Sequence, residues 1–238
     1  MKAIRSLLLS AALLTAAGLP AQTPSAWPAG EVVPAEAVAA ADPESCFTAR
    51  PLDEALVRRI DGHSYREGCP VALSELRYLR VLHVDAEGQT RAGELICHRE
   101  IADDLLAIFR TLYEAGYPIE RMVLVDDYGA DDERSMRANN SSAFNYRRIA
   151  GSSRVSEHGY GRAVDINPLY NPYVRERDGR RTVSPAEGAP YADRSKPFPY
   201  KIEADDLCCR EFRRRGFVWG GAWTSVKDYQ HFEKPAAK

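Results

Sequence analysis

The sequence lacks an excess of charge of either sign. Its 238 residues include 32 Lys and Arg against 34 Asp and Glu, for a formal net charge of −2. The densest cationic run is the three arginines at 213–215, and it lies in a segment with helical periodicity, where a solvated helix face is the ordinary explanation. Because nucleic acids bind clustered basic surfaces, the charge pattern predicts no nucleic-acid partner.

Long hydrophobic runs are absent beyond the first 21 residues. Residues 1–21 contain Lys2 and Arg5, then an uncharged run of Leu and Ala, then small residues before Gln22, a pattern typical of a secretory signal peptide. The apolar run is shorter than the roughly 20 residues that cross a bilayer. We therefore expect an exported protein, periplasmic or extracellular, whose mature form has no membrane span.

Cysteine patterns of zinc fingers are also missing. The five cysteines include the adjacent pair Cys208 and Cys209, and the others lie far apart. In an oxidising compartment we expect at least one disulfide, although spacing does not determine the pairing. The sequence has no Gly-x-Ser-x-Gly elbow and no local signature of a catalytic thiol, which argues against a nucleophile-based hydrolase.

Composition divides the remaining chain into two parts. Residues 22–45 are rich in Ala, Pro, Val and Glu without periodicity, which predicts a flexible linker. Residues 46–238 have the size of one domain with a sizeable core, and no internal repeat is visible.

Hydrophobic periodicity predicts a hairpin followed by a helix. Two strand-like runs at 77–85 and 92–98 flank a short loop. Apolar residues recur at helical spacing from Ile101 to Leu112, and Gly116 ends the pattern. Since strands and helices do not alternate regularly, we expect an α+β fold with a small antiparallel sheet and packed helices. Further predicted elements are a buried strand at 122–125, a helix at 203–215, final strands at 217–219 and 229–233, and a long binding loop at 168–199.

The strongest motif is SEHGYGRAVDIN at residues 156–167. Its glycines permit a sharp turn, and the residues after them alternate like a strand, so that His158 and Asp165 can converge. Near the C-terminus, Asp228 and His231 supply a second carboxylate and imidazole. Two imidazoles and a carboxylate, with a fourth position open, are the usual composition of a catalytic zinc site. The other histidines, at 63, 83 and 98, have no comparable partners.

Residues 156–165 resemble the Ser-x-His-x-x-Gly-x-Ala-x-Asp signature of the D-Ala-D-Ala carboxypeptidase family of zinc peptidases, which includes VanY and the VanX dipeptidase. Residues 223–233, with their Asp-x-x-His-Phe core, resemble the closing motif of that family. The similarity runs from about residue 93 to residue 233. It implies that His158, Asp165 and His231 hold one Zn²⁺ per chain in a cleft on the sheet, in a fold related to that of the Hedgehog signalling domain.

The resemblance also implies a general base. Asp228 stands at its position, where the dipeptidase branch has a Glu, and the shorter side chain leaves Glu233 and Glu157 as alternatives. Strand alternation would place Asp228 and His231 on opposite faces, so we expect a bend between them.

Four more residues are candidates for substrate contact. Arg147 resembles an arginine that family members place near the substrate, where a guanidinium suits an oxyanion or a terminal carboxylate. A solvated surface charge is the alternative. We expect Ser156 to orient the site by hydrogen bonding, and Tyr160 and Trp223 to line the cleft, whereas Trp219 equally suits the core.

The implied activity is hydrolysis of D-amino-acid-containing peptides of peptidoglycan. A terminal carboxypeptidase, a dipeptidase and an endopeptidase all share these residues, so the cleaved bond stays open. A non-catalytic zinc module and a peptidoglycan-binding protein are the rival hypotheses, and Asp228 at the base position favours an enzyme.

Overall fold

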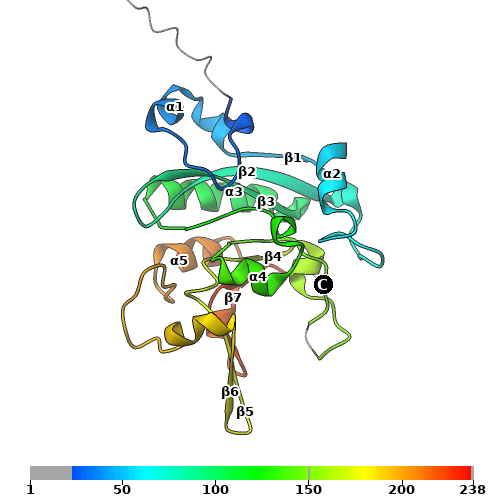
Figure 1. Ribbon diagram of the computed structural model, residues 1–238, viewed down its shortest axis with the longest axis vertical. Coiled ribbons are helices and arrows are strands. Elements are labelled where there is room, and N and C mark those ends of the chain that lie inside the picture. The colour runs from blue at the N-terminus through cyan, green and yellow to red at the C-terminus, as the bar shows by residue number, and fades with distance from the viewer. Residues whose placement is uncertain (1–22, 150, 237–238) are drawn as a thin grey trace, which may run out of the picture.

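The computed structural model describes residues 23–149 and 151–236. All the pairings between its strands are antiparallel, and the strands form three three-stranded sheets, ordered β1-β2-β3, β4-β9-β7 and β6-β5-β8. The α+β expectation is therefore confirmed, with three small sheets where one was expected (Figure 1). The strands are β1 (Thr48–Pro51), β2 (Leu76–Val84), β3 (Thr90–His98), β4 (Ala163–Asp165), β5 (Tyr173–Arg177), β6 (Arg180–Ser184), β7 (Val218–Trp219), β8 (Lys227–Asp228) and β9 (His231–Glu233).

The helices are short except for one. The α-helices are α1 (Ala35–Ala40), α2 (Glu54–Ile60), α3 (Arg99–Glu114), α4 (Asp132–Arg137) and α5 (Leu207–Arg214). The 3-10 helices are η1 (Pro24–Ala26), η2 (Pro43–Cys46), η3 (Leu73–Glu75), η4 (Val125–Tyr128), η5 (Glu157–Tyr160), η6 (Ala186–Tyr191) and η7 (Gly220–Ala222). In the residues described, no helix has the length and apolar character needed to cross a membrane.

The predicted hairpin and helix are both present. Strands β2 and β3 pair over nine residues, and α3 follows directly. The His98 side chain accepts a hydrogen bond from the Glu100 amide at the start of α3, and Gly116 takes a positive φ of 66° just beyond its end. The apolar face of α3 is buried against β2 on the first sheet and contacts α5. Helix α3 therefore joins the first sheet to the part of the molecule that carries the second.

Helix α5 fixes the position of strand β9. The Asp206 side chain accepts a hydrogen bond from the Cys209 amide and caps α5, so the helix is shorter than the expected span of 203–215. Phe212 of α5 is fully buried and stacks on Phe232 of β9 with ring centroids 4.2 Å apart. Trp219 of β7 also stacks near Phe232, which settles it as a core residue. Aromatic packing thus holds the central strand of the second sheet.

Residues 23–45 differ from the expected flexible linker. Trp27 and Val33 are 5% and 4% exposed and belong to the main hydrophobic core. The Val33 amide donates to the Thr90 carbonyl oxygen at the edge of β3, and the Arg80 guanidinium donates to the Trp27 carbonyl oxygen. Isolated apolar residues without periodicity are enough to pack this segment against the first sheet. The expected signal peptide at residues 1–21 lies outside the residues described.

The expected strand at 122–125 is wrong, although the segment is buried as expected. The Asn140 side chain pairs with both backbone groups of Val123: its Oδ1 accepts from the amide at 2.9 Å, and its Nδ2 donates to the carbonyl at 3.0 Å. An amide side chain thereby satisfies backbone groups that a neighbouring strand would otherwise satisfy.

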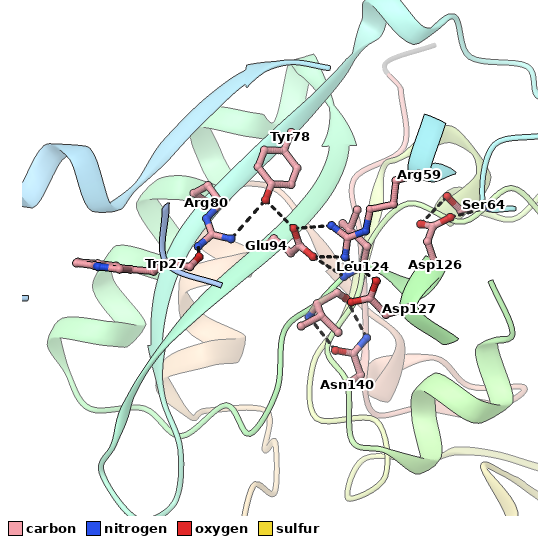
Figure 2. Close-up of polar contacts among 11 residues, drawn as sticks. Trp27, Arg59, Ser64, Tyr78, Arg80, Glu94, Leu124, Asp126, Asp127 and Asn140 are labelled. Carbon is pink, nitrogen blue, oxygen red and sulfur yellow. Dashed lines mark hydrogen bonds and ion pairs between the residues drawn. The ribbon is translucent and has the colours of Figure 1, made fainter. Parts of the chain in front are cut away.

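A charged network built around the buried Glu94 carboxylate lies beside this segment (Figure 2). The Glu94 side chain is 2% exposed and accepts two hydrogen bonds from Arg59, at 2.6 and 3.0 Å, and one from the Tyr78 hydroxyl at 2.6 Å. Arg59 also pairs with Asp127 at 2.6 Å. Burial and the Glu94 charge raise the pKa of Tyr78 to about 12, so its phenol stays protonated and donates. We call Glu94, Arg59, Tyr78 and Asp127 the Glu94 network.

The expected disulfide is absent, because all five cysteines are free. Cys97 lies on β3, and Cys208 and Cys209 lie on α5, and all three are buried. Burial raises the pKa of each of these thiols, so they behave as small apolar core residues.

The expected loop at 168–199 contains regular structure. Strands β5 and β6 form a hairpin closed by Asp178 and Gly179, both at positive φ, and the hairpin projects from the body of the molecule (Figure 1). Strand β8 pairs with β5 on its other side, with Tyr173 opposite Asp228. The third sheet is thus built from this insertion and a short strand that carries a candidate site residue.

Candidate metal centre

His158 is placed by a short 3-10 turn. The Ser156 side chain accepts from the His158 amide at 3.4 Å at the start of η5, and Gly161 ends the turn at a φ of 66°. The imidazole Nδ1 lies 2.6 Å from the Ala143 carbonyl oxygen. A carbonyl only accepts, so Nδ1 carries the proton and Nε2 presents its lone pair to the site.

Asp165 and His231 are brought together by strand pairing. Asp165 ends β4 and His231 begins β9, and their Cα atoms are direct partners in the antiparallel register. Side chains at such paired positions project from the same face of a sheet. Two residues that are 66 positions apart in the sequence therefore meet on one face of the second sheet.

These three residues, which we call the donor trio, converge on one point. His158 Nε2 lies 3.1 Å from His231 Nδ1 and 3.2 Å from Asp165 Oδ2, and His231 Nδ1 lies 3.1 Å from Asp165 Oδ1. All three residues are buried, with exposures of 3%, 8% and 6% for His158, Asp165 and His231. They form a group whose ligand atoms lie within 4.8 Å of one another.

The arrangement fits a zinc ion by its donor chemistry. His231 Nε2 lies 3.0 Å from the Glu233 carboxylate and donates to it, which leaves Nδ1 facing the trio. Two imidazole nitrogens and a carboxylate thus face one another, and such acceptors attract each other only with a cation between them. Tetrahedral zinc bonds of about 2.0–2.1 Å place ligand atoms about 3.3 Å apart, close to the separations observed.

The pKa shifts of the donor trio also favour a positive charge at this point. Burial alone would lower the pKa of His231, but its hydrogen bonds with Asp165 and Glu233 raise it to about 10. Burial would raise the pKa of Asp165, and the facing His158 and His231 hold it well below its ordinary range. The carboxylate therefore stays ionised and a positive charge is favoured beside it, supplied by a proton when no metal is bound.

Asp228 lies in a different sheet from His231. It pairs with Tyr173 in the third sheet, whereas His231 pairs with Asp165 in the second, so the expected bend between 228 and 231 is present. Asp228 is half-buried, but its Oδ1 atom is buried and has no hydrogen-bond partner among the described residues. Burial raises the pKa of Asp228 to about 6, with Asp165 adding to the shift and His231 opposing it. This carboxylate can exchange a proton near neutral pH.

The alternative bases differ in their surroundings. Glu233 accepts from His231 Nε2 and so orients that imidazole, as carboxylates beside metal-ligating histidines often do. Glu157 is half-buried, and burial together with the Glu233 charge raises its pKa. Of the three carboxylates, only Asp228 has a buried oxygen without a partner.

Arg147 lies near the turn that carries His158 and is paired with an acid. Its guanidinium forms an ion pair with Asp132 of α4, and its side chain is 33% exposed. Its carbonyl oxygen accepts from the Ser156 amide at 3.0 Å. The arginine is thus attached to the site segment by its backbone and held by Asp132, with part of its surface open to solvent.

The other expected contact residues lie in three kinds of environment. Ser156 is 6% exposed and caps η5, so it orients His158. Tyr160 is half-buried and packs against a second apolar cluster with Leu76 and Phe144. Trp223 is half-buried with its ring centroid 5.4 Å from that of His231, which places an aromatic surface beside the donor trio.

Sequence reasoning did not single out Gly220. A β-carbon there would lie 2.6 Å from the Asp228 carbonyl oxygen and 3.3 Å from His231 Cβ, so the absent side chain lets η7 pack closely against both β8 and β9. The adjacent glycines at 220 and 221, shortly before the closing motif, were the available signal.

A buried trio of two imidazoles and a carboxylate on a small antiparallel sheet defines a candidate mononuclear metal centre. Residues 150–234 match a family model described as D-alanyl-D-alanine carboxypeptidase. The match confirms the family resemblance over the segment that carries the donor trio, and it supports a peptidase. Residues 93–149, with Arg147, lie outside the matched segment. No curated protein and no solved structure matches the chain.

Proposed function

We propose that the protein is an exported zinc-dependent peptidase that hydrolyses D-amino-acid-containing peptides of peptidoglycan, in the manner of a D-Ala-D-Ala carboxypeptidase. The observation that carries the proposal is the donor trio, whose three ligand atoms face one another while the far nitrogen of each imidazole is committed to an acceptor. Such a buried arrangement is costly without a cation. The matched family supplies the peptide substrate class.

His158 Nε2, Asp165 and His231 Nδ1 would hold the zinc. Ala143 and Glu233 fix which nitrogen each imidazole offers. When bound, zinc lowers the pKa of a coordinated water and polarises a carbonyl group.

Asp228 is the proposed general base. Its partner-free Oδ1 accepts a proton from the attacking water and returns it to the leaving amine, for which a pKa raised to about 6 is suitable near neutral pH. Glu233 is less suited to this task because its carboxylate already accepts from His231.

Three further residues complete the proposed site in a cleft on the second sheet. Arg147, held by Asp132, would bind a terminal carboxylate or stabilise the oxyanion. Trp223 would form a wall beside His231, and Tyr160 would support the turn from its apolar cluster.

The test uses purified mature protein and defined muropeptides, with products identified by mass spectrometry. We expect D-amino-acid release that a chelator abolishes and added zinc restores. Metal analysis should find about one zinc per wild-type chain and a loss of most of it in His158→Ala. The exposed His63→Ala is the matched control and should keep its metal. Intact muropeptides after incubation with fully zinc-loaded protein would overturn the proposal and favour a binding module.

A further inference from the structure

The β5–β6 hairpin has two chemically different faces. Residues alternate sides along a strand, and direct partners share a side. Arg175, Arg177 and Arg180 therefore lie on one face, since Arg177 pairs with Arg180 and Arg175 pairs with Thr182. Glu176 and Arg181 pair on the opposite face and form an ion pair at 2.7 Å. We call the first of these the arginine face.

The arginine face carries excess positive charge. All three of its arginines are exposed, and the one ion pair that they form with the described residues joins Arg177 to Asp178, at 3.5 Å. Arg175 and Arg180 have no ion pair within residues 23–149 and 151–236. Together with Asp178 and Thr182, the three arginines line an open hollow of about 510 Å³. A chain with nearly balanced charge thus concentrates positive charge on one face of a hairpin. This hairpin projects from the body of the molecule (Figure 1).

This face continues into the candidate active site. Tyr173 is the direct partner of Asp228 on β8, and it lies on the same side of β5 as Arg175 and Arg177. Burial raises the pKa of the Tyr173 phenol, and both the Arg175 and the Asp228 charges act on it, which agrees with its position between them. At about 3.4 Å per residue, Arg175 and Arg177 stand about 7 and 14 Å along the strand from Tyr173.

We propose that the arginine face binds side-chain carboxylates of the substrate peptide, about two to four residues from the bond that is cleaved. An extended peptide advances about 3.3–3.6 Å per residue, so a substrate whose scissile bond lies beside Asp228 reaches Arg175 and Arg177 at those positions. Guanidinium groups pair with carboxylates in a planar, bidentate geometry. The inference rests on the proposed function, and it assigns a specificity surface to the hairpin.

The first experiment compares two peptides that end in D-Ala-D-Ala. One peptide has D-Glu, and the other D-Gln, at the positions two to four residues before the bond that is cleaved. Wild-type protein is expected to show the lower KM for the acidic peptide. The variant Arg175→Gln/Arg177→Gln/Arg180→Gln should raise the KM for the acidic peptide about fivefold, a modest change because exposed ion pairs are individually weak. It should leave kcat, and the KM for the D-Gln peptide, unchanged. Arg181→Gln, on the opposite face of the same hairpin, is the matched control and should change the KM of neither peptide.

The second experiment measures binding without catalysis. A fluorescently labelled oligo-D-glutamate should bind the full wild-type chain, weaken at high salt, and lose most of its binding in the triple variant. Binding of this probe without hydrolysis of any muropeptide would refute the proposed function while retaining the arginine face. Cleavage of both peptides with equal KM by wild type and triple variant would refute the arginine face alone. Tighter binding of an inorganic polyphosphate of equal charge would also overturn the assignment to peptide carboxylates.

Discussion

Two polar clusters differ in how their polar atoms are paired: the Glu94 network, built around a buried carboxylate, and the buried donor trio. In the Glu94 network, the carboxylate accepts from the guanidinium of Arg59 and the hydroxyl of Tyr78, so acceptors meet donors (Figure 2). In the donor trio, two imidazole nitrogens and a carboxylate face one another, so lone pairs oppose lone pairs unless a proton or a metal ion lies between them. Folding removes water from charged groups in both clusters. Only in the Glu94 network do hydrogen bonds within the chain itself replace the lost contacts with water.

The difference separates structural from functional burial of charge. A network that satisfies its own groups specifies how elements pack, and here it joins β2, β3 and α2. A cluster whose acceptors face one another needs an external cation. The free-energy cost of burying these acceptors is offset only when the cation binds. The contrast predicts that a mutation in the Glu94 network lowers stability and leaves zinc binding intact, whereas a mutation in the donor trio abolishes zinc binding.

The largest expected effect is on stability. Glu94→Ala should lower the free energy of unfolding by about 3–5 kcal/mol, because it leaves the buried Tyr78 hydroxyl without its acceptor and leaves the half-buried Arg59 guanidinium paired with Asp127 alone. Its zinc content per folded chain should stay normal. Chemical denaturation and metal analysis measure the two quantities. Glu54→Ala is the control, since Glu54 forms an exposed ion pair with Arg58 and should change stability by less than about 1 kcal/mol.

His158→Ala, in the donor trio, provides the opposite test to Glu94→Ala. Zinc added to metal-free protein should raise the melting temperature of wild type and of Glu94→Ala, and should leave that of His158→Ala unchanged. A zinc-dependent rise in His158→Ala equal to that of wild type would contradict the assignment of the donor trio.

A buried imidazole outside both clusters gives the next effect. His83 donates from Nδ1 to the Ile119 carbonyl oxygen at 2.7 Å, and its buried Nε2 has no hydrogen-bond partner in the part of the chain that the structure describes. Burial lowers the pKa of His83 from about 6.5 to about 4. The folded protein therefore binds fewer protons than the unfolded chain between these values, and stability is lost as pH falls through this window.

That loss should total about 3 kcal/mol between pH 6.5 and pH 4, in addition to what other groups contribute. The measurement is the denaturation free energy across this range in wild type and in His83→Leu. The variant should show a correspondingly smaller dependence on pH and an unchanged zinc content. Parallel pH curves for the two proteins would be inconsistent with a neutral buried His83.

The third effect separates metal binding from chemistry within the site. Asp228→Asn should retain zinc and lose at least about 100-fold in kcat/KM, or about 2.7 kcal/mol, because the amide cannot accept the proton of water. Steady-state kinetics and metal analysis on the same preparation provide the test. If Asp228→Asn stays active and Glu233→Gln is inactive with its zinc intact, Glu233 is the base.

The smallest effect concerns the terminal carboxylate. Amidating a peptide that ends in D-Ala-D-Ala should cost more than about 1.4 kcal/mol, or about tenfold in kcat/KM, and Arg147→Ala should largely erase that preference. Arg148→Ala is the matched control, because Arg148 is exposed and, among the residues that the structure describes, its side chain donates only to the Ser153 carbonyl oxygen. Equal cleavage of free and amidated peptides by wild type would instead indicate an endopeptidase.

Long periodic segments were predictable because their burial follows from local sequence. The β2–β3 hairpin and α3 carry their own periods and end signals, and both lie where they were expected. Residues 122–125 have the composition of a strand, but their backbone partner is the side chain of Asn140, which composition does not reveal. The β5–β6 hairpin was missed although Asp178 and Gly179 form a recognisable turn pair.

The donor trio was predictable from motif spacing, while its surroundings depend on tertiary pairing. His158 and Asp165 lie in one motif, and the closing motif supplies His231. The opposition of Tyr173 and Asp228 depends on the register of β5 with β8, which neither motif contains. Trp27 was assigned to a linker because a single apolar residue without periodicity carries no local signal of burial.

Gly161 has a consequence for how related chains can vary. A β-carbon at this position would lie 2.7 Å from the His98 backbone nitrogen, which itself donates to the Gly161 carbonyl oxygen, and the residue adopts a positive φ of 66°. A lineage that abandoned catalysis would therefore still be under selection to keep this glycine, since losing it would disrupt the junction of β3 and α3. Under the proposed function, Asp228 would be free to vary in such a lineage, whereas Gly161 would still be required by the packing of η5 against β3.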